Sequence, residues 1–447
     1  MNSSPMPHSS PLNYNRTGLG VNWRFVIWVM TLFLAWYPFI NIFSQLGTVD
    51  PALNDIPISR FFNYAALILF SWIFIASTKS FSPASLSLSA LLLVMLFANY
   101  ALTDYASTKW LLNWLGFVFI SIVIVNVLAK ASRFDLEVIQ ASILGTLNIC
   151  SILLALLLII YTFSNFSEIP IYNGTYDYSS ALWVLGCTVG IEKQAFGNFL
   201  CYLMLLNFHF WRHQSKKKNI LFVALIVLLI PVGLTTIRTL FLGLALWATW
   251  LFLTRRPRLM FASTIMLIPG MAFGYLYLSD IIIFVGGAYD RFSSLKFAFT
   301  TMLSMPFGLG NGGYHVFVAD NNASLLANFA SESIKKTGLF WGAPESDLVY
   351  FIASWGVFSI IFYAMFFYLL FKGGFILRVF PHLLPIEKVF ISMSWAMIFM
   401  GISQDNAGYL LWWIHMAAGY GIVLRHSRSI HSKVKTVEHF AVSGASK

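Results

Sequence analysis

The sequence predicts an all-α polytopic membrane protein, and three observations support this fold class. Of its 447 residues, 58% are hydrophobic and only 10% are charged, whereas soluble domains carry roughly 25% charged residues. Apolar runs of about 20 residues, the length that a helix needs to cross a bilayer, recur along the whole chain. Lys and Arg gather in alternate connections between these runs. A single membrane domain over residues 1–447 is therefore expected.

Twelve apolar runs are candidate transmembrane helices. In chain order they are 23–44, 61–78, 83–102, 111–129, 138–164, 195–211, 219–236, 239–254, 259–285, 348–371, 388–403 and 407–424. Residues 1–21 are polar and the first apolar run is long enough to span, so no cleavable signal peptide is expected. The two runs beside Arg238 form a tight pair without room for a real loop.

The basic residues predict the orientation of the chain. With the N-terminus inside, 20 of the 28 Lys and Arg residues fall on the inner side, as the positive-inside rule requires. Both termini are therefore expected in the cytoplasm. These inner connections account for much of the net charge of +11, so nucleic acid is not expected as a partner.

Two outer connections are too long to be simple turns, and loops of such length are usually functional or disordered. The first, 165–194, is bordered and interrupted by tyrosines, and the second covers 286–347. The second opens at Arg291 with helical periodicity and charges on one edge, which predicts an amphipathic helix lying in the outer interface. A glycine-rich stretch over 308–313 follows it.

Arg238 is the first candidate functional residue, because it lies between two apolar runs. A guanidinium at the centre of a membrane helix costs roughly 2.5–3.5 kcal/mol, so it should face protein or water and pair with an anion. The functional interpretation is an anchor for phosphate, which arginine binds in bidentate fashion. A snorkelling arginine or a structural ion pair is the alternative.

Further candidates lie on the second long connection. Arg291 and Lys296 could contact a pyrophosphate or an anionic sugar, or rest on lipid headgroups. Glu345 could act as a general base on a sugar hydroxyl. Ser346 and Asp347 directly precede an apolar helix, where capping of the helix N-terminus is the simpler explanation.

Three more polar residues complete the candidate site. His315 follows the glycine-rich stretch, whose glycines are too irregular for a phosphate loop. Gln404 and Asp405 lie on the last outer turn. They either line a substrate cavity together with the residues above or form a solvent-exposed turn. No metal-ligand spacing and no Walker motif occur, so neither a metal nor a cofactor is expected.

The order and spacing of these motifs resemble those of the bacterial O-antigen polymerase and O-antigen ligase superfamily, over residues 190–360. Three features carry the resemblance. They are the helix residues Thr235-Thr236-Ile237-Arg238, the loop residues Arg291-Phe292, Ala298, Pro306 and Gly308-Leu309-Gly310, and the step from Glu345-Ser346-Asp347 to Trp355-Gly356-Val357. Ligases tend to have His where this chain has Glu345, which favours the polymerase branch.

The resemblance implies a GT-C-like, metal-independent glycosyltransferase in a bacterial inner membrane. Such enzymes join undecaprenyl-pyrophosphate-linked oligosaccharide repeat units at the periplasmic face, building O-antigen for lipopolysaccharide or an exopolysaccharide. Arg238 and Arg291 would hold the pyrophosphate, and Glu345 would orient or deprotonate the acceptor hydroxyl. The other substrate contacts would come from Lys296, His315, Asp347, Gln404 and Asp405.

Three alternatives remain open at the level of sequence. A ligase would use the same donor and transfer the glycan to a lipid A core or a protein. A flippase or other transporter would place its charges within the spans, and an assembly subunit would not need Arg238. The implied partners are the lipid-linked repeat units, membrane lipid, a chain-length co-polymerase and a flippase.

Overall fold

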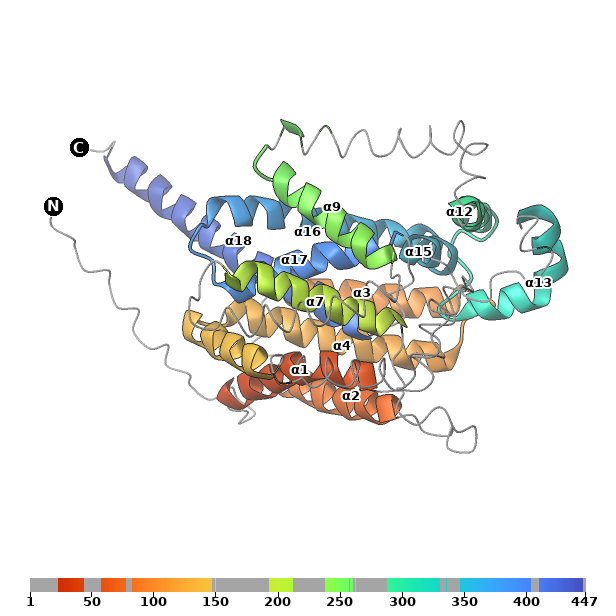
Figure 1. Cartoon of the computed structure of the whole chain (residues 1–447), viewed down its shortest axis with the longest axis horizontal. Coiled ribbons are helices and arrows are strands. Elements are labelled where there is room, and N and C mark those ends of the chain that lie inside the picture. The colour runs from red at the N-terminus through yellow and green to blue at the C-terminus, as the bar shows by residue number, and fades with distance from the viewer. Residues whose placement is uncertain are drawn as a thin grey trace, which may run out of the picture.

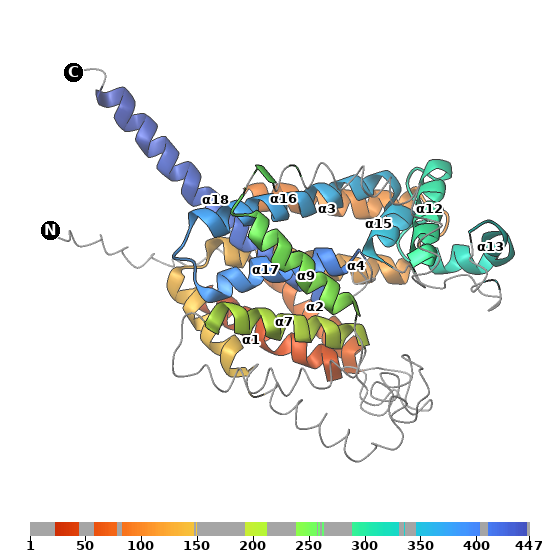
Figure 2. The same cartoon turned by 45° about the horizontal axis from the view of Figure 1, so that its top comes forward.

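Long apolar runs fold as helices in a computed structural model of the chain (Figures 1 and 2). The structure describes residues 23–43, 58–77, 83–146, 193–211, 238–256, 288–329, 346–402 and 410–444, with a few isolated positions. The elements of this part are helical and none is a strand, which confirms the all-α fold class for the described residues.

Most helices begin close to the start of a predicted span where the chain is described, but the last helix continues to residue 444, beyond the predicted end at residue 424. The ten helices on predicted spans are α1 (Trp23–Phe43), α2 (Ile58–Ser77), α3 (Pro83–Ala101), α4 (Thr108–Lys130), α7 (Lys193–Trp211), α9 (Arg238–Leu253), α15 (Asp347–Trp355), α16 (Ser359–Val379), α17 (Pro385–Met400) and α18 (Leu410–Gly444). The predicted span 138–164 is helical as far as residue 146. The span 219–236 lies outside the described residues, as does nearly all of 259–285.

Two helical runs of the described part are long and apolar enough to cross a bilayer. They are Thr108–Lys130, with a mean hydropathy of 2.3, and Asp347–Val379, with a mean hydropathy of 2.0. Five further apolar stretches lie in shorter described segments of 10–17 residues. A hydrocarbon core of about 30 Å needs about 20 helical residues, a length that Thr108–Lys130 and Asp347–Val379 both reach.

The bundle is built around α4, α17 and α18. Helix α4 packs against α2, α3 and α18, and α17 packs against α7, α9 and α18. Gly421 of α18 allows a close approach to α4, because a Cβ atom there would lie 2.9 Å from Cβ of Leu128. Large aromatic side chains fill the core, and four tryptophans are almost completely buried: Trp114, Trp355, Trp395 and Trp412.

The bundle has two distinct ends. We call the end that carries α12 (Ala288–Ser304), α13 (Gly313–Phe329) and the start of α15 the loop end. The opposite end, which we call the terminal end, holds the start of α17 and the point where α18 leaves the bundle (Figures 1 and 2). There the ring of Phe380, which follows α16, lies 4.9 Å from that of His426.

The second long connection is more structured than the sequence suggests. The predicted amphipathic helix exists as α12, with Phe297 and Ala298 buried and Lys296 and Phe299 exposed. Its buried side packs against α15. A second helix, α13, was not predicted, because its apolar residues are interrupted by a polar stretch that includes Asp320.

The run predicted as one helix over 348–371 is interrupted. Helix α15 ends at Trp355, a 3-10 turn covers Gly356–Phe358, and α16 begins at Ser359. Gly356 has a φ of 52°, a conformation that glycine adopts without the steric cost that other residues meet. The prediction of a continuous helix was therefore wrong at this point, because hydropathy does not register a change in backbone direction.

Candidate functional site

The predicted site residues fall on several elements. Arg238 is the first residue of α9, Arg291 and Lys296 belong to α12, and Asp347 is the first residue of α15. His315 lies in the first turn of α13. Glu345, Gln404 and Asp405 lie outside the described residues, as do the side chains of Arg238, Arg291 and His315.

The start of α9 lies at the loop end, near Asp347. Gly243 of α9 contacts Met400, the last residue of α17, so closely that an added Cβ atom would overlap the Met400 side chain. The next residue, Gly401, accepts the backbone N–H of Asp347 at 2.8 Å. Arg238 precedes Gly243 by five residues, or about 7.5 Å of helix. The backbone of Arg238 is therefore close to this junction.

Asp347 is a buried carboxylate at a helix N-terminus. Its exposed fraction is 4%, and its side chain packs against Gly401, where an added Cβ atom would overlap Oδ2. Ser346 caps the helix, because its hydroxyl accepts the backbone N–H of Val349 at 3.2 Å. The free N–H groups of the first turn favour a negative charge here. The capping explanation thus holds for Ser346, while Asp347 adds a buried carboxyl group.

Helix α12 lies beside α15 at the same end. Phe297 and Ala298 share a small core with Val349 and Ile352. Lys296 lies on the exposed side of α12, away from this core. The structure therefore brings the helix that carries Arg291 to the same end as the start of α9 and Asp347, and leaves the Lys296 side chain on the surface.

The glycine-rich stretch packs closely against two other segments of the chain. Gly308, Gly310 and Gly312 have φ values of 83°, 84° and 79°. A Cβ atom on Gly308 would lie 2.5 Å from the carbonyl carbon of Ser354, and one on Gly310 would lie 2.9 Å from Cα of Ala106. Because these glycines have no side chains, the stretch can approach the backbone at Ser354 on one side and at Ala106 on the other. This close packing accounts for the glycines, so a bound phosphate is not needed to explain them.

Three buried polar residues at the loop end were not among the candidate residues predicted from the sequence. They are Asn99 near the end of α3, Asn311 in the glycine-rich stretch, and Tyr350 in α15. The Tyr350 hydroxyl donates to Oδ1 of Asn311 at 2.5 Å. Asn99 interrupts the apolar run 83–102 shortly before its end, and this interruption is the one clue that the sequence offers.

An aromatic cluster lies beneath the glycine-rich stretch. The Trp114 ring is 4.8 Å from Trp355, 4.8 Å from Trp413 and 5.9 Å from Tyr350, measured between centroids. Trp114 and Trp355 are 0% and 1% exposed. These buried rings therefore pack the core of the bundle.

An apolar pocket opens between α3, α4, α16 and α18. Its lining is built mainly of aliphatic, methionine and aromatic side chains, among them Leu92, Ile122, Phe366 and Met416. It extends along α18 from Trp412 to Tyr420. The chemistry of this lining suits a hydrocarbon chain.

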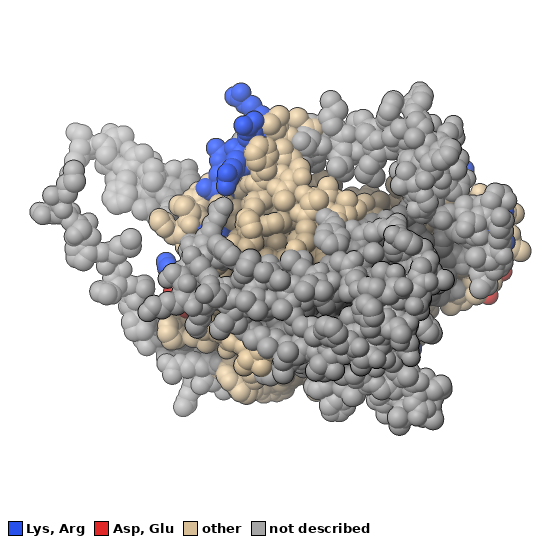
Figure 3. All heavy atoms as spheres, viewed as in Figure 1, with Lys and Arg blue, Asp and Glu red and all other residues tan. Residues whose placement is uncertain are grey.

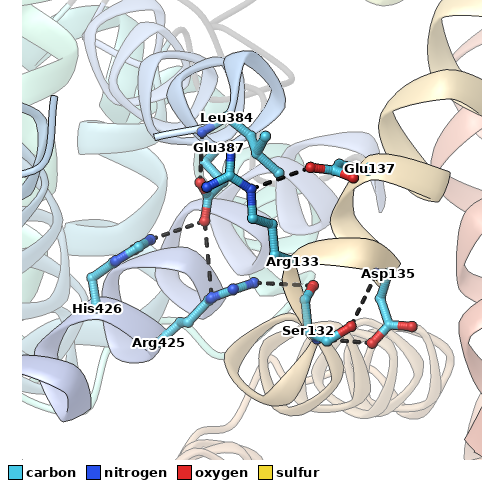
Figure 4. A network of polar contacts seen from close by, with 8 residues as sticks. All are labelled: Ser132, Arg133, Asp135, Glu137, Leu384, Glu387, Arg425 and His426. Atoms are coloured by element: carbon cyan, nitrogen blue, oxygen red, sulfur yellow. Dashed lines mark hydrogen bonds and ion pairs between the residues drawn. The ribbon is translucent and has the colours of Figure 1, made fainter. Parts of the chain in front are cut away.

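A polar network at the terminal end joins α17 and α18 to the segment after α4 (Figure 4). Oε1 of Glu387 accepts a hydrogen bond from Nε2 of His426 at 2.9 Å and lies 3.9 Å from Nε of Arg425. Oε2 accepts the backbone N–H of Leu384 at 2.8 Å. Nη1 of Arg425 reaches the carbonyl of Ser132 at 3.5 Å. This network is separate from the loop end.

Burial and hydrogen bonding act in opposite directions on the Glu387 carboxyl. Burial alone raises its pKa, but the hydrogen bond and charge of His426, the Leu384 N–H and the charge of Arg425 together lower the pKa below its ordinary value. The same burial lowers the pKa of Arg425. Glu387 is therefore a structural carboxylate that stays ionised at neutral pH.

In the part of the chain that is described, no group of three or more His, Cys, Asp or Glu side chains is placed to hold a metal ion. A scan against protein-family models and searches of curated proteins and of solved structures give no match for this chain. The candidate site therefore rests on the residues themselves and on their arrangement at the loop end.

Proposed function

We propose that this chain is a polytopic protein of a bacterial inner membrane, with 12 spans and both termini in the cytoplasm. Two helical runs meet the length and hydropathy of membrane spans, which supports this architecture. On the face in Figure 3, described Lys and Arg side chains gather mainly toward the terminal end, and the described middle of the bundle is free of charge. Exposed Arg255, Arg256 and Arg258 follow α9. This asymmetry is what the positive-inside rule expects.

We further propose that it is a polysaccharide polymerase that joins polyprenyl-pyrophosphate-linked repeat units at the outer face. The observation that carries this proposal is the meeting of three elements at the loop end: the start of α9, the buried carboxylate of Asp347, and α12. These elements carry two of the three residues expected to act in catalysis, Arg238 and Arg291. The apolar pocket offers space of suitable chemistry for the prenyl chain.

The reaction needs an acid–base group and an anion site. The acceptor hydroxyl oxygen forms a bond to the anomeric carbon of the donor, and the bond from that carbon to the pyrophosphate oxygen breaks. The hydroxyl proton passes to Glu345, and the prenyl pyrophosphate leaves. Arg238 and Arg291 stabilise the charge that grows on the leaving group, as fixed cations do in a site shielded from water. In this scheme Asp347 helps to orient the Arg238 guanidinium.

Reconstitution with lipid-linked repeat units, without metal or nucleotide, tests this function. The native chain should give a ladder of products, and Arg238→Ala should lower the rate by about 10² or more, as for loss of one charge-stabilising group. Arg255→Ala is the matched control, since Arg255 is exposed beyond the far end of α9. A ladder that persists in Arg238→Ala would remove the anion-anchor role.

The acceptor distinguishes the polymerase from a ligase. Transfer to a lipid A core and no extension of lipid-linked units would identify a ligase instead. Movement of the intact lipid-linked unit across the membrane, without any new glycosidic bond, would identify a flippase.

A further inference from the structure

The break between α15 and α16 is filled by another part of the chain. In a continuous helix the carbonyls of Ala353 and Ser354 would accept N–H groups from four residues further on. Here they accept the N–H groups of Leu309 at 2.8 Å and Gly310 at 3.1 Å. The glycine-rich stretch thus replaces two hydrogen bonds of the helix at Gly356. Its position and that of the helix break depend on each other.

One buried side chain joins the two partners of this contact. Nδ2 of Asn99 donates to the carbonyl of Phe307 at 3.0 Å and to that of Ser354 at 3.0 Å. Oδ1 of Asn99 accepts the backbone N–H of Asn311 at 3.1 Å. Both amide hydrogens are therefore used, and the residue is 0% exposed. A side-chain amide is well suited to this task, since it offers two donors and an acceptor in one plane.

The effect of this anchor extends to the candidate site. Asn311 is held on its other side by the hydroxyl of Tyr350, which lies one turn after Asp347 on α15. The glycine-rich stretch also joins α12, which carries Arg291, to α13. Asn99 therefore fixes the connection between α12 and α15 from a third element, α3.

We propose that Asn99 is a positioning residue for the site at the loop end, acting through the glycine-rich stretch. This inference rests on the proposed function. Asn99 itself touches no substrate; it sets the register of α12 against α15, and so the distance between the pyrophosphate-binding arginine on α12 and the groups around Asp347. Misplacing such groups by about 1 Å can reduce a rate by about 10².

Asn99→Ala tests this proposal with two measurements. Amide hydrogen exchange on the native chain should show slow exchange at Leu309 and Gly310, and Asn99→Ala should accelerate it by about 10². Turnover per folded molecule should fall by about tenfold or more, while KM for the lipid-linked unit changes by less than about threefold, because the prenyl pocket is untouched. A purely structural residue would reduce the yield of folded protein and leave turnover per folded molecule unchanged.

The control is Asn328→Ala on α13, where the amide is exposed and bonds Ser324 at 3.4 Å; neither measurement should change. Tyr350→Phe removes the hydrogen bond to Asn311 and should give a smaller change of the same kind. If Asn99→Ala does not fold, Tyr350→Phe becomes the test variant. Unchanged exchange and unchanged turnover in Tyr350→Phe would then overturn the proposal.

The outcomes distinguish the positioning role of Asn99 from the proposed polymerase function. Retained protection of Leu309 and Gly310 in Asn99→Ala, or turnover within twofold of the native value, overturns the proposal. If the native chain gives no ladder, the polymerase function fails, and the exchange measurement decides on the anchor alone: accelerated exchange supports it and retained protection overturns it.

Discussion

Glu387→Gln isolates the contribution of one buried carboxylate to stability. The side chain is 5% exposed and keeps almost its shape in the variant, so little packing is lost. An amide oxygen can still accept the N–H of Leu384. What disappears is the negative charge between His426 at 2.9 Å and Arg425 at 3.9 Å.

The expected loss follows from these contacts. A hydrogen bond to a charged group contributes about 1.5–3 kcal/mol, and the longer contact to the partly exposed Arg425 adds about 0.5 kcal/mol. Glu387→Gln should therefore lower the free energy of unfolding by about 2–3.5 kcal/mol. Titration with a denaturing detergent, followed by tryptophan fluorescence, measures this loss. Glu137→Gln is the control, because its pair with Arg133 is exposed and should contribute less than about 0.5 kcal/mol.

The pH dependence has a definite sign. Folding lowers the pKa of Glu387, so its contribution is complete above the ordinary pKa of about 4.3 and is lost as the pH falls through the lower folded value. The stability difference between native chain and Glu387→Gln should shrink in acid, below a pH of about 4. A difference that grows in acid, or equal stability at pH 7, would refute this account of the network.

Three further substitutions should change stability in the same unfolding assay. Gly356→Ala should cost about 3 kcal/mol or more, because the residue has a φ of 52° and an added Cβ atom would overlap the carbonyl oxygen of Pro306; native-like stability would contradict the described break. Ser346→Ala should cost about 1 kcal/mol through loss of the helix cap, and no loss would mean that water replaces the hydroxyl. Gly421→Val should cost about 2–3 kcal/mol by forcing α18 away from α4, and a neutral result would show that the two helices are not in close contact.

The positions of most described helices could be predicted from sequence, because long apolar runs mark helices with buried apolar side chains directly. Nine of the described helices, α15 among them, begin within three residues of the start of a predicted span. The interruption at Gly356 could not be predicted, since it depends on hydrogen bonds from residues about 45 positions earlier, Leu309 and Gly310. Helix α13 was missed because its polar residues obscure the apolar periodicity.

In the candidate site too, residues whose role depends on distant contacts could not be predicted from the sequence. Asp347 was singled out because acidic residues before an apolar run are visible in the sequence. Asn99 was not, because its role depends on partners more than 200 residues away, the carbonyls of Phe307 and Ser354. Long-range pairing of this kind leaves no periodicity behind. The network of Glu387 and His426 likewise joins two helices that the sequence separates by 39 positions.

Helix α18 has a practical consequence for structure determination. It runs without interruption for 35 residues, about 52 Å at 1.5 Å per residue. Its first turns are anchored in the core by Trp412 and Ile414, and its last turns leave the bundle (Figure 1). A small folded protein fused in helical phase after Gly444 would be held at a fixed distance from the bundle by this rigid helix, and would serve as an alignment marker for electron microscopy of so small a protein.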